Sequence, residues 1–181
     1  MAPTDTVSPE VFPLFGSLGA DELALLADRA TAVAVAAGQA LFRQGDRGES
    51  LYLLAAGRVE VVASEDGGPE HRLATLDPGA ILGEVAVLID APRTATAVAV
   101  VDARLWEISR SSFRDAVAGN QRWAVVLLLS IARVLAERLA TVDGRLLAAI
   151  AREREVEEPS GGGRVAELER LRRRLLTDWT F

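Results

Sequence analysis

The 181-residue sequence contains no cysteine, no lysine and a single histidine, His71. The absence of cysteine excludes disulfides and thiolate metal sites. Catalytic metal sites need clustered histidines and carboxylates, and a nucleophilic triad needs a histidine beside its nucleophile. His71 follows Glu70 and precedes Arg72 in a predicted surface strand, which is not a setting of that kind. We therefore expect no bound metal, no cofactor and no enzymatic activity.

Long apolar runs and an N-terminal export signal are also missing. The longest apolar run, Trp123 to Ile131, is flanked by arginines and is much shorter than the roughly 20 residues of a membrane-spanning helix. The N-terminus carries Asp5 and Glu10 instead of a basic start followed by an apolar core. We expect a cytoplasmic protein without a membrane span.

Charge is distributed unevenly along the chain, whose formal net charge is −6. Residues 1–118 contain 9 arginines and 17 acidic residues, whereas the remainder contains 11 arginines and 9 acidic residues. General nucleic-acid binding needs a basic footprint, so the acidic body argues against it. An anionic ligand would need a local positive centre in this body, and Arg93 is the candidate.

Short apolar runs punctuated by glycine extend from Thr31 to Ser109, after two short helices predicted at Pro9–Phe15 and Asp21–Ala30. This pattern predicts a mainly β fold with flanking helices, an N-terminal helical element and an eight-stranded jelly-roll-like β-barrel. Barrels of this size can enclose a small ligand. The expected strands are Thr31–Val35, Gln39–Phe42, Ser50–Leu54, Arg58–Ala63, His71–Leu76, Ala80–Leu82, Thr94–Val100 and Arg104–Ile108.

One long helix is predicted from about Gln121 to Glu157, after a short helix that ends at Gly119. Its apolar residues alternate by three and four positions, the spacing of a coiled-coil seam. The helix either packs on its own barrel, which its first half can do, or meets a second copy. We favour a parallel homodimer through this long C-terminal dimerisation helix. The seam residues are Val125, Leu128, Ala132, Leu135, Leu139, Val142, Leu146 and Ala149.

The predicted organisation has five segments. A disordered N-terminus (1–8) precedes the barrel domain (9–118) and the coiled-coil-like long helix (119–158). A Pro-Ser-Gly-Gly-Gly flexible linker (159–163) then leads to an amphipathic tail helix (164–181) rich in leucine and arginine. The tail either folds back onto its parent domain or docks on a protein partner. A membrane-surface role is the third reading, which its acidic residues weaken.

The most informative stretch runs from Gly83 to Thr96 and reads Gly-Glu-Val-Ala-Val-Leu-Ile-Asp-Ala-Pro-Arg-Thr-Ala-Thr. Arg93 offers a planar fork of donors to a phosphate, and Glu84 offers acceptors to sugar hydroxyls. Gly83 lets backbone approach a ligand closely, and the amides after Glu84 can line an anion-binding concavity. A phosphate and a hydroxylated sugar held together indicate a nucleotide. The alternative reading of Glu84 and Arg93 is a solvated ion pair.

This stretch resembles the phosphate-binding cassette of the cyclic-nucleotide-binding domain family. The matching residues are Gly83, Glu84, Val85, Ala86, Arg93 and Thr94. The glycine-punctuated strands around Leu41–Asp46, Leu51–Leu54 and Gly57–Val59 are similar as well, and the resemblance extends from about Phe12 to Leu147. Leu82 departs from the family, which often has Phe there, and this affects packing beneath the cassette more than ligand chemistry.

The resemblance implies a ligand, cyclic AMP or cyclic GMP, and a role for each site residue. The cyclic phosphate would lie on Arg93 and on backbone amides, and the ribose 2′-hydroxyl on Glu84 with Gly83 alongside. Thr94 can donate its hydroxyl to the phosphate or accept from the exocyclic amine of a guanine, so it admits cyclic GMP without excluding cyclic AMP. Arg138 would lie near the base, unless it is a solvent-facing flank of the seam. The amides implied are those of Val85, Ala86 and Ala95.

The expected function is a cyclic-nucleotide receptor that signals to a partner through its C-terminal helices. The alternative is a ligand-independent scaffold or docking protein on the same fold. The catabolite-activator relatives continue into a helix-turn-helix domain, whereas Pro159 to Phe181 is too short for one. We therefore do not expect direct DNA binding by this chain.

Overall fold

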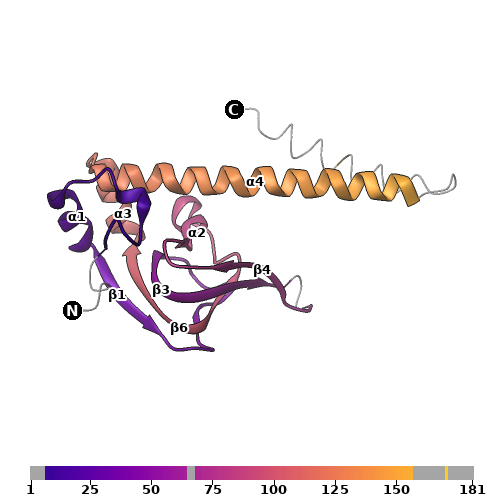
Figure 1. The fold of residues 1–181 in the computed structure, drawn as a ribbon, viewed down its shortest axis with the longest axis horizontal. Coiled ribbons are helices and arrows are strands. Elements are labelled where there is room, and N and C mark those ends of the chain that lie inside the picture. Colours follow the sequence, from indigo (N-terminus) through magenta and orange to yellow (C-terminus); the bar gives the residue numbers. More distant parts are fainter. Residues whose placement is uncertain (1–6, 65–67, 157–169, 171–181) are drawn as a thin grey trace. The chain divides into compact units, whose positions relative to one another are not determined.

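The computed structural model describes residues 7–64, 68–156 and 170, with their side chains except those of residues 143 and 145–156 (Figure 1). The fold is mainly β with flanking helices. The helical elements are η1 (Pro13–Phe15, a 3₁₀ helix), α1 (Ala20–Ala27), α2 (Glu84–Ile89), α3 (Arg110–Ala118) and α4 (Arg122–Val156). The strands are β1 (Ala30–Val35), β2 (Ala40–Phe42), β3 (Ser50–Ala63), β4 (His71–Leu76), β5 (Ile81–Leu82) and β6 (Thr96–Ser109).

All strands of the described residues pair antiparallel in one sheet of order β1-β6-β3-β4, with β2 also on β6 and β5 also on β3. The two 14-residue strands β3 and β6 form its centre. Their register places Tyr52 opposite Glu107 and Leu53 opposite Trp106. This register determines which polar groups lie near the candidate site.

The prediction of eight strands is wrong for the described residues, which form six strands in an open sheet. Ser50–Leu54 and Arg58–Ala63 are one strand, because Gly57 forms a bulge and does not end the ladder. Its φ is 90°, and a Cβ at this position would lie 2.4 Å from the Asp102 carbonyl oxygen. The register shifts at three places here, so the strand bends without breaking. The facing strand β6 likewise joins two predicted strands.

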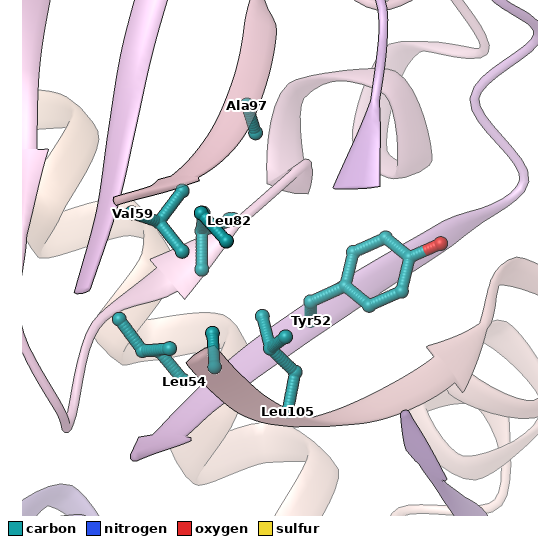
Figure 2. Packing of buried hydrophobic residues seen from close by; sticks show 8 residues of the cluster. Tyr52, Leu54, Val59, Leu82, Ala97 and Leu105 are labelled. Carbon is teal, nitrogen blue, oxygen red and sulfur yellow. The ribbon is translucent and has the colours of Figure 1, made fainter. Parts of the chain in front are cut away.

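Small and branched apolar side chains fill the space between β3, β5 and β6. Figure 2 shows Leu54, Val59, Leu82, Ala97 and Leu105 in one buried cluster, together with Tyr52. The hydroxyl of Tyr52 points away from the other labelled side chains. The ring of Tyr52 therefore belongs to the core, while its hydroxyl lies outside this cluster.

The chain divides into two compact units, residues 1–131 and 132–181, and α4 contributes residues to both. In the first unit, the start of α4 has one fully buried face, formed by Trp123, Ala124, Leu127 and Ile131. Sequence spacing of one, four and eight residues gives this face, as expected for an amphipathic helix. The first part of α4 thus belongs to the core of its own domain.

Several predicted segments lie outside the described residues. These are residues 1–6 of the N-terminus, the glycine linker at 159–163, and the tail helix at 164–181 apart from Arg170. Val7, at the edge of the predicted disordered segment, is a buried side chain with 1% exposure.

Candidate ligand-binding site

The candidate site is built around α2, which follows directly from β5. Gly83 precedes the helix in the left-handed region with a φ of 75°. A Cβ there would lie 2.2 Å from Nη1 of Arg93, so both the backbone angle and the space require glycine. Asp90 ends the helix, also with a left-handed φ of 55°. These two turns fix where the first amides of α2 and the following Arg93 lie.

Arg93 is an almost fully buried cation, with 5% of its surface exposed. Its Nη1 donates a hydrogen bond to the Gly83 carbonyl oxygen at 3.1 Å. The guanidinium carbon lies 4.2 Å from the centre of the Phe42 ring and 5.5 Å from that of Tyr52. The two rings are stacked with centroids 5.9 Å apart. Aromatic faces on one side and a carbonyl on another hold the guanidinium in one orientation.

The backbone of Arg93 is fixed to the loop after β2. Its N–H donates to the Asp46 carbonyl oxygen at 2.8 Å, and its own carbonyl accepts from the Gly45 N–H at 2.9 Å. Two hydrogen bonds on one residue leave little freedom for the chain at this point. The cassette and the β2–β3 loop therefore form one frame around the guanidinium.

Burial and neighbouring groups act on Arg93 in opposite directions. Burial lowers the pKa of Arg93, while Tyr52, Glu107 and Asp46 act in the opposite direction. A guanidinium remains protonated at neutral pH even so. Its Nε is buried without a hydrogen-bond partner. A buried cation with an unsatisfied donor fits an anionic group that is not part of the chain.

Sequence reasoning missed Glu107, a carboxylate whose charge acts on Arg93. Glu107 on β6 accepts a hydrogen bond from Ser50 Oγ at 2.5 Å and one from the Tyr52 hydroxyl at 3.1 Å. Burial raises the pKa of Tyr52, and the charge of Glu107 raises it further. The signal in the sequence was a glutamate within the apolar run Leu105 to Ile108. Its meaning depends on the register that places it opposite Tyr52.

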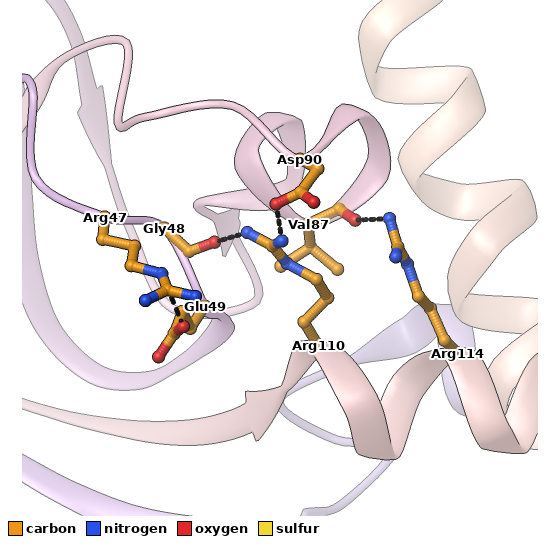
Figure 3. Close-up of polar contacts among 7 residues, drawn as sticks. All are labelled: Arg47, Gly48, Glu49, Val87, Asp90, Arg110 and Arg114. Atoms are coloured by element: carbon orange, nitrogen blue, oxygen red, sulfur yellow. Dashed lines mark hydrogen bonds and ion pairs between the residues drawn. The ribbon is translucent and has the colours of Figure 1, made fainter.

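Two arginines of α3 contact the far end of the cassette, as Figure 3 shows. Arg110 forms an ion pair with Asp90 and donates to the Gly48 carbonyl oxygen. Arg114 Nη2 donates to the Val87 carbonyl oxygen at 3.4 Å. Cationic donors at the last carbonyls of a helix are favourable because those groups lack partners within the helix. The sequence analysis did not single out either arginine.

The structure brings the seven predicted cassette residues together in one segment. Glu84 opens α2 and is 4% exposed, Ala95 is buried, and Thr94 is exposed. Arg138 is an exposed residue of the second unit, so its place near a base stays a prediction. The binding roles of all these residues likewise remain predictions.

The predicted seam residues differ in exposure. Val125, Leu128 and Leu135 are half-buried and Ala132 is exposed. Leu139 and Val142 are 41% and 56% exposed. The side chains of Leu146 and Ala149 lie outside the described ones, and the seam stays a prediction.

Two other predictions concern metals and membranes. Within the described ranges, no three histidine, aspartate or glutamate side chains are grouped so as to hold a metal ion. No described helix combines the length and the apolar character needed to cross a membrane.

Comparison with known proteins gives the context of this geometry. Residues 32–120 match the family described as cyclic nucleotide-binding domain. The chain is 34% identical over 131 residues to the cyclic AMP receptor protein of Thermus thermophilus, covering 72% of this chain and 59% of that protein. The crystal structure of the Thermus thermophilus catabolite activator protein superposes with a TM-score of 0.67 at 34% identity, covering 76% of this chain and 63% of that one.

Two further relatives show how widely the domain is used. The regulatory domain of Toxoplasma gondii PKA, in a co-crystal structure with cAMP, has a TM-score of 0.51 at 34% identity and covers 56% of this chain and 39% of that one. The acetyltransferase Pat of Mycolicibacterium smegmatis is 45% identical over 76 residues, which are 42% of this chain and 22% of that enzyme. The chain spans about 59% of the first relative and less of these two. With the buried arginine of the cassette, these matches show that residues 32–120 belong to the cyclic nucleotide-binding domain family.

Proposed function

We propose that this chain is a cyclic-nucleotide receptor that takes cyclic AMP or cyclic GMP and passes its bound state to a partner. The observation that carries the proposal is Arg93, which is 5% exposed and has a buried Nε without a hydrogen-bond partner. Burying a cation with an unsatisfied donor is costly unless an anion pairs with it. A cyclic phosphate supplies that anion.

The other cassette residues take complementary roles in this proposal. The amides of Val85 and Ala86, in the first turn of α2, and the amide of Ala95 would donate to the phosphate oxygens. Glu84, buried at the start of α2, would accept from the ribose 2′-hydroxyl. Gly83 keeps the space beside Arg93 open because any side chain would overlap Nη1.

The base preference is a separate part of the proposal. Cyclic AMP is favoured as the first ligand to test, because the PKA regulatory domain that resembles this chain was crystallised with it. Thr94 is exposed and carries a hydroxyl, so it leaves cyclic GMP open. Arg138 stays the residue proposed to lie near the base.

Transmission is proposed to run from the cassette into α3 and α4. Arg110 and Arg114 attach α3 to Asp90, Gly48 and Val87, so a shift of the cassette displaces α3. α3 leads within four residues into α4, whose exposed Leu139 and Val142 would form a homodimer seam. A protein partner at residues 164–181 and a cytoplasmic location belong to the same proposal.

Catalysis and direct DNA binding are not part of the proposed function. Residues 1–118 carry 17 acidic residues against 9 arginines, which disfavours a polyanion. The similarity to acetyltransferase Pat covers 22% of that enzyme, so it concerns the shared domain.

Isothermal titration of the purified chain with cyclic AMP and cyclic GMP, each alone, tests the proposal. We expect micromolar or tighter binding of at least one, lost in Arg93→Glu. Because reversing a buried charge can prevent folding, Arg93→Met is the second variant, since it keeps the apolar stem above Phe42. Arg43→Met, on the exposed loop before Gly45, is the matched control and should bind like the wild type.

A well-folded chain that gives neither heat nor a thermal shift with either nucleotide would contradict the receptor. The alternative, a ligand-independent scaffold on this fold, would then be favoured. Under that alternative, deletion of residues 164–181 should abolish partner capture while Arg93→Met changes nothing.

A further inference from the structure

Glu107 is a carboxylate whose charge acts on Arg93, the guanidinium that the proposed function assigns to the phosphate. It lies opposite Tyr52 in the β3–β6 ladder and accepts from the Tyr52 hydroxyl at 3.1 Å. Tyr52 in turn faces Arg93, whose guanidinium carbon lies 5.5 Å from its ring centre. Tyr52 therefore contacts both Glu107 and Arg93.

The carboxylate is held firmly in that place. Ser50 Oγ donates to the same Oε1 atom at 2.5 Å, and Ser50 is itself 9% exposed. Because Tyr52 uses its only proton to donate to Glu107, the lone pairs of its hydroxyl are left for donors such as the Arg93 guanidinium. Glu107 thereby acts on Arg93 in two ways, by its charge and by orienting the Tyr52 hydroxyl.

Negative charge is already abundant around Arg93. The charges of Glu107 and Asp46 both favour the cationic form of Arg93, and the buried Glu84 opens the helix beside it. An arriving phosphate adds a further anion to the same guanidinium. In a buried site, like charges separated by several ångströms still repel measurably because water screens them poorly.

We propose that Glu107 is an internal counter-charge that partly neutralises the Arg93 guanidinium and thereby limits its affinity for an anionic ligand. This inference rests on the proposed function, because the anion is the cyclic phosphate. It makes Glu107 an affinity-setting residue that never touches the ligand and acts through Arg93 and Tyr52.

The test is Glu107→Gln, titrated calorimetrically with cyclic AMP beside the wild type. Glutamine keeps an acceptor for Ser50 and Tyr52 but removes the charge, so we expect affinity to rise about fivefold at low ionic strength. The gain should shrink only slightly as salt is added, because salt screens buried charges much less than exposed ones. Glu107→Asp, which keeps the charge, should stay close to the wild type.

Two controls separate this effect from other causes. Glu60→Gln makes the same change on the same sheet at a glutamate paired with Arg72 at 3.1 Å, away from Arg93, and should leave affinity unchanged. Adenosine, which lacks the phosphate, should bind the wild type and Glu107→Gln equally. If Glu107→Gln is poorly folded, Glu107→Ala gives the same test, since it also removes the charge.

The outcomes distinguish this inference from the function on which it rests. If the wild type binds and both neutral variants, folded, bind equally or more weakly, Glu107 is structural and the inference alone is overturned. If no folded form of the chain binds either cyclic nucleotide, the proposed function fails and the inference fails with it. Tighter binding by Glu60→Gln as well would show an effect of net charge only, which also overturns it.

Discussion

Gly48 lies directly against Ala86 of the cassette helix, so close that a Cβ on Gly48 would come within 2.2 Å of the Ala86 Cβ. The same Cβ would lie 3.2 Å from the Ala91 carbonyl oxygen and 3.4 Å from Cδ of Arg93. The β2–β3 loop and α2 thus touch through two small residues. This contact allows the loop and the cassette to enclose the guanidinium together.

Gly48→Ala should therefore disturb both folding and binding. We expect the free energy of unfolding to fall by about 1–3 kcal/mol, because α2 must move away from an overpacked contact. Cyclic-nucleotide affinity should fall as well, since Arg93 moves with it. Gly144→Ala is the control, because a Cβ there meets nothing within 4 Å and should stabilise α4 by about 1 kcal/mol. Urea unfolding and calorimetry measure both quantities, and equal behaviour of the two variants would contradict the contact.

Arg110 should be far more important for stability than Arg47, the exposed arginine next to Gly48 in Figure 3. Its side chain is 16% exposed and holds both Asp90 and the Gly48 carbonyl oxygen. Arg110→Met leaves that carbonyl without its donor, so we expect a loss of about 1–3 kcal/mol in the free energy of unfolding. Arg47→Met removes only an ion pair with Glu49 at 2.8 Å, whose side chains are 85% and 60% exposed, and should change stability by less than about 1 kcal/mol.

The Arg110→Met variant also tests whether α3 transmits the ligand-bound state to α4. If Arg110→Met binds cyclic nucleotide with nearly wild-type affinity but no longer changes partner binding or dimerisation on ligand addition, α3 carries the signal. If Arg110→Met loses stability but keeps the full ligand response, the role of Arg110 is structural only.

Tyr52 should titrate above the ordinary tyrosine pKa of about 10. Burial is the largest cause and the negative charge of Glu107 the next, so Glu107→Gln should lower the pKa of Tyr52 toward 10 without reaching it. Because the native state keeps the proton longer than the unfolded chain, stability should fall as pH rises above about 10. The chain has one tyrosine, so the ultraviolet absorbance of tyrosinate reports Tyr52 alone. An identical midpoint in both proteins would place Glu107 too far away to act.

The cassette could be predicted from sequence because its parts are local. Gly83, Glu84 and Arg93 lie within ten residues of one another, and the six-residue helix α2 lies between Gly83 and Arg93. Glycine at 83 and arginine at 93 each have few substitutes in their roles, so the pattern is specific. The structure places Arg93 against the Gly83 carbonyl oxygen, as such a short connection requires.

The groups around the cassette could not be predicted in the same way. Tyr52 and Glu107 are 55 residues apart, and Arg110 and Gly48 are 62 apart. These pairs meet only through the β3–β6 register, and a shift of one residue would turn Glu107 to the other face. Phe42, which lies over Arg93, also depends on the placement of β2. Long-range register is not encoded in any short motif.

The strand count was wrong for a related reason, and Gly57 supplies the test. Glycine between two apolar runs indicates a turn, yet here it allows a bulge where β3 crosses Asp102 and Ala103. Gly57→Ala combines a φ of 90° with a Cβ 2.4 Å from the Asp102 carbonyl oxygen and 2.6 Å from the Ala103 Cα. Gly38→Ala has a similar φ of 80° and nothing within 4 Å.

The difference between these two variants isolates the cost of the overlap. Gly38→Ala should lose only the left-handed strain, about 1–2 kcal/mol in the free energy of unfolding. Gly57→Ala should lose about 1–3 kcal/mol more, since it overpacks the centre of the sheet as well. Urea unfolding of both variants against the wild type measures the two losses. Equal losses would mean that β3 and β6 separate at Gly57 without cost. Gly57 would then lie in an ordinary turn, and the prediction of two strands within Ser50–Ala63 would be correct.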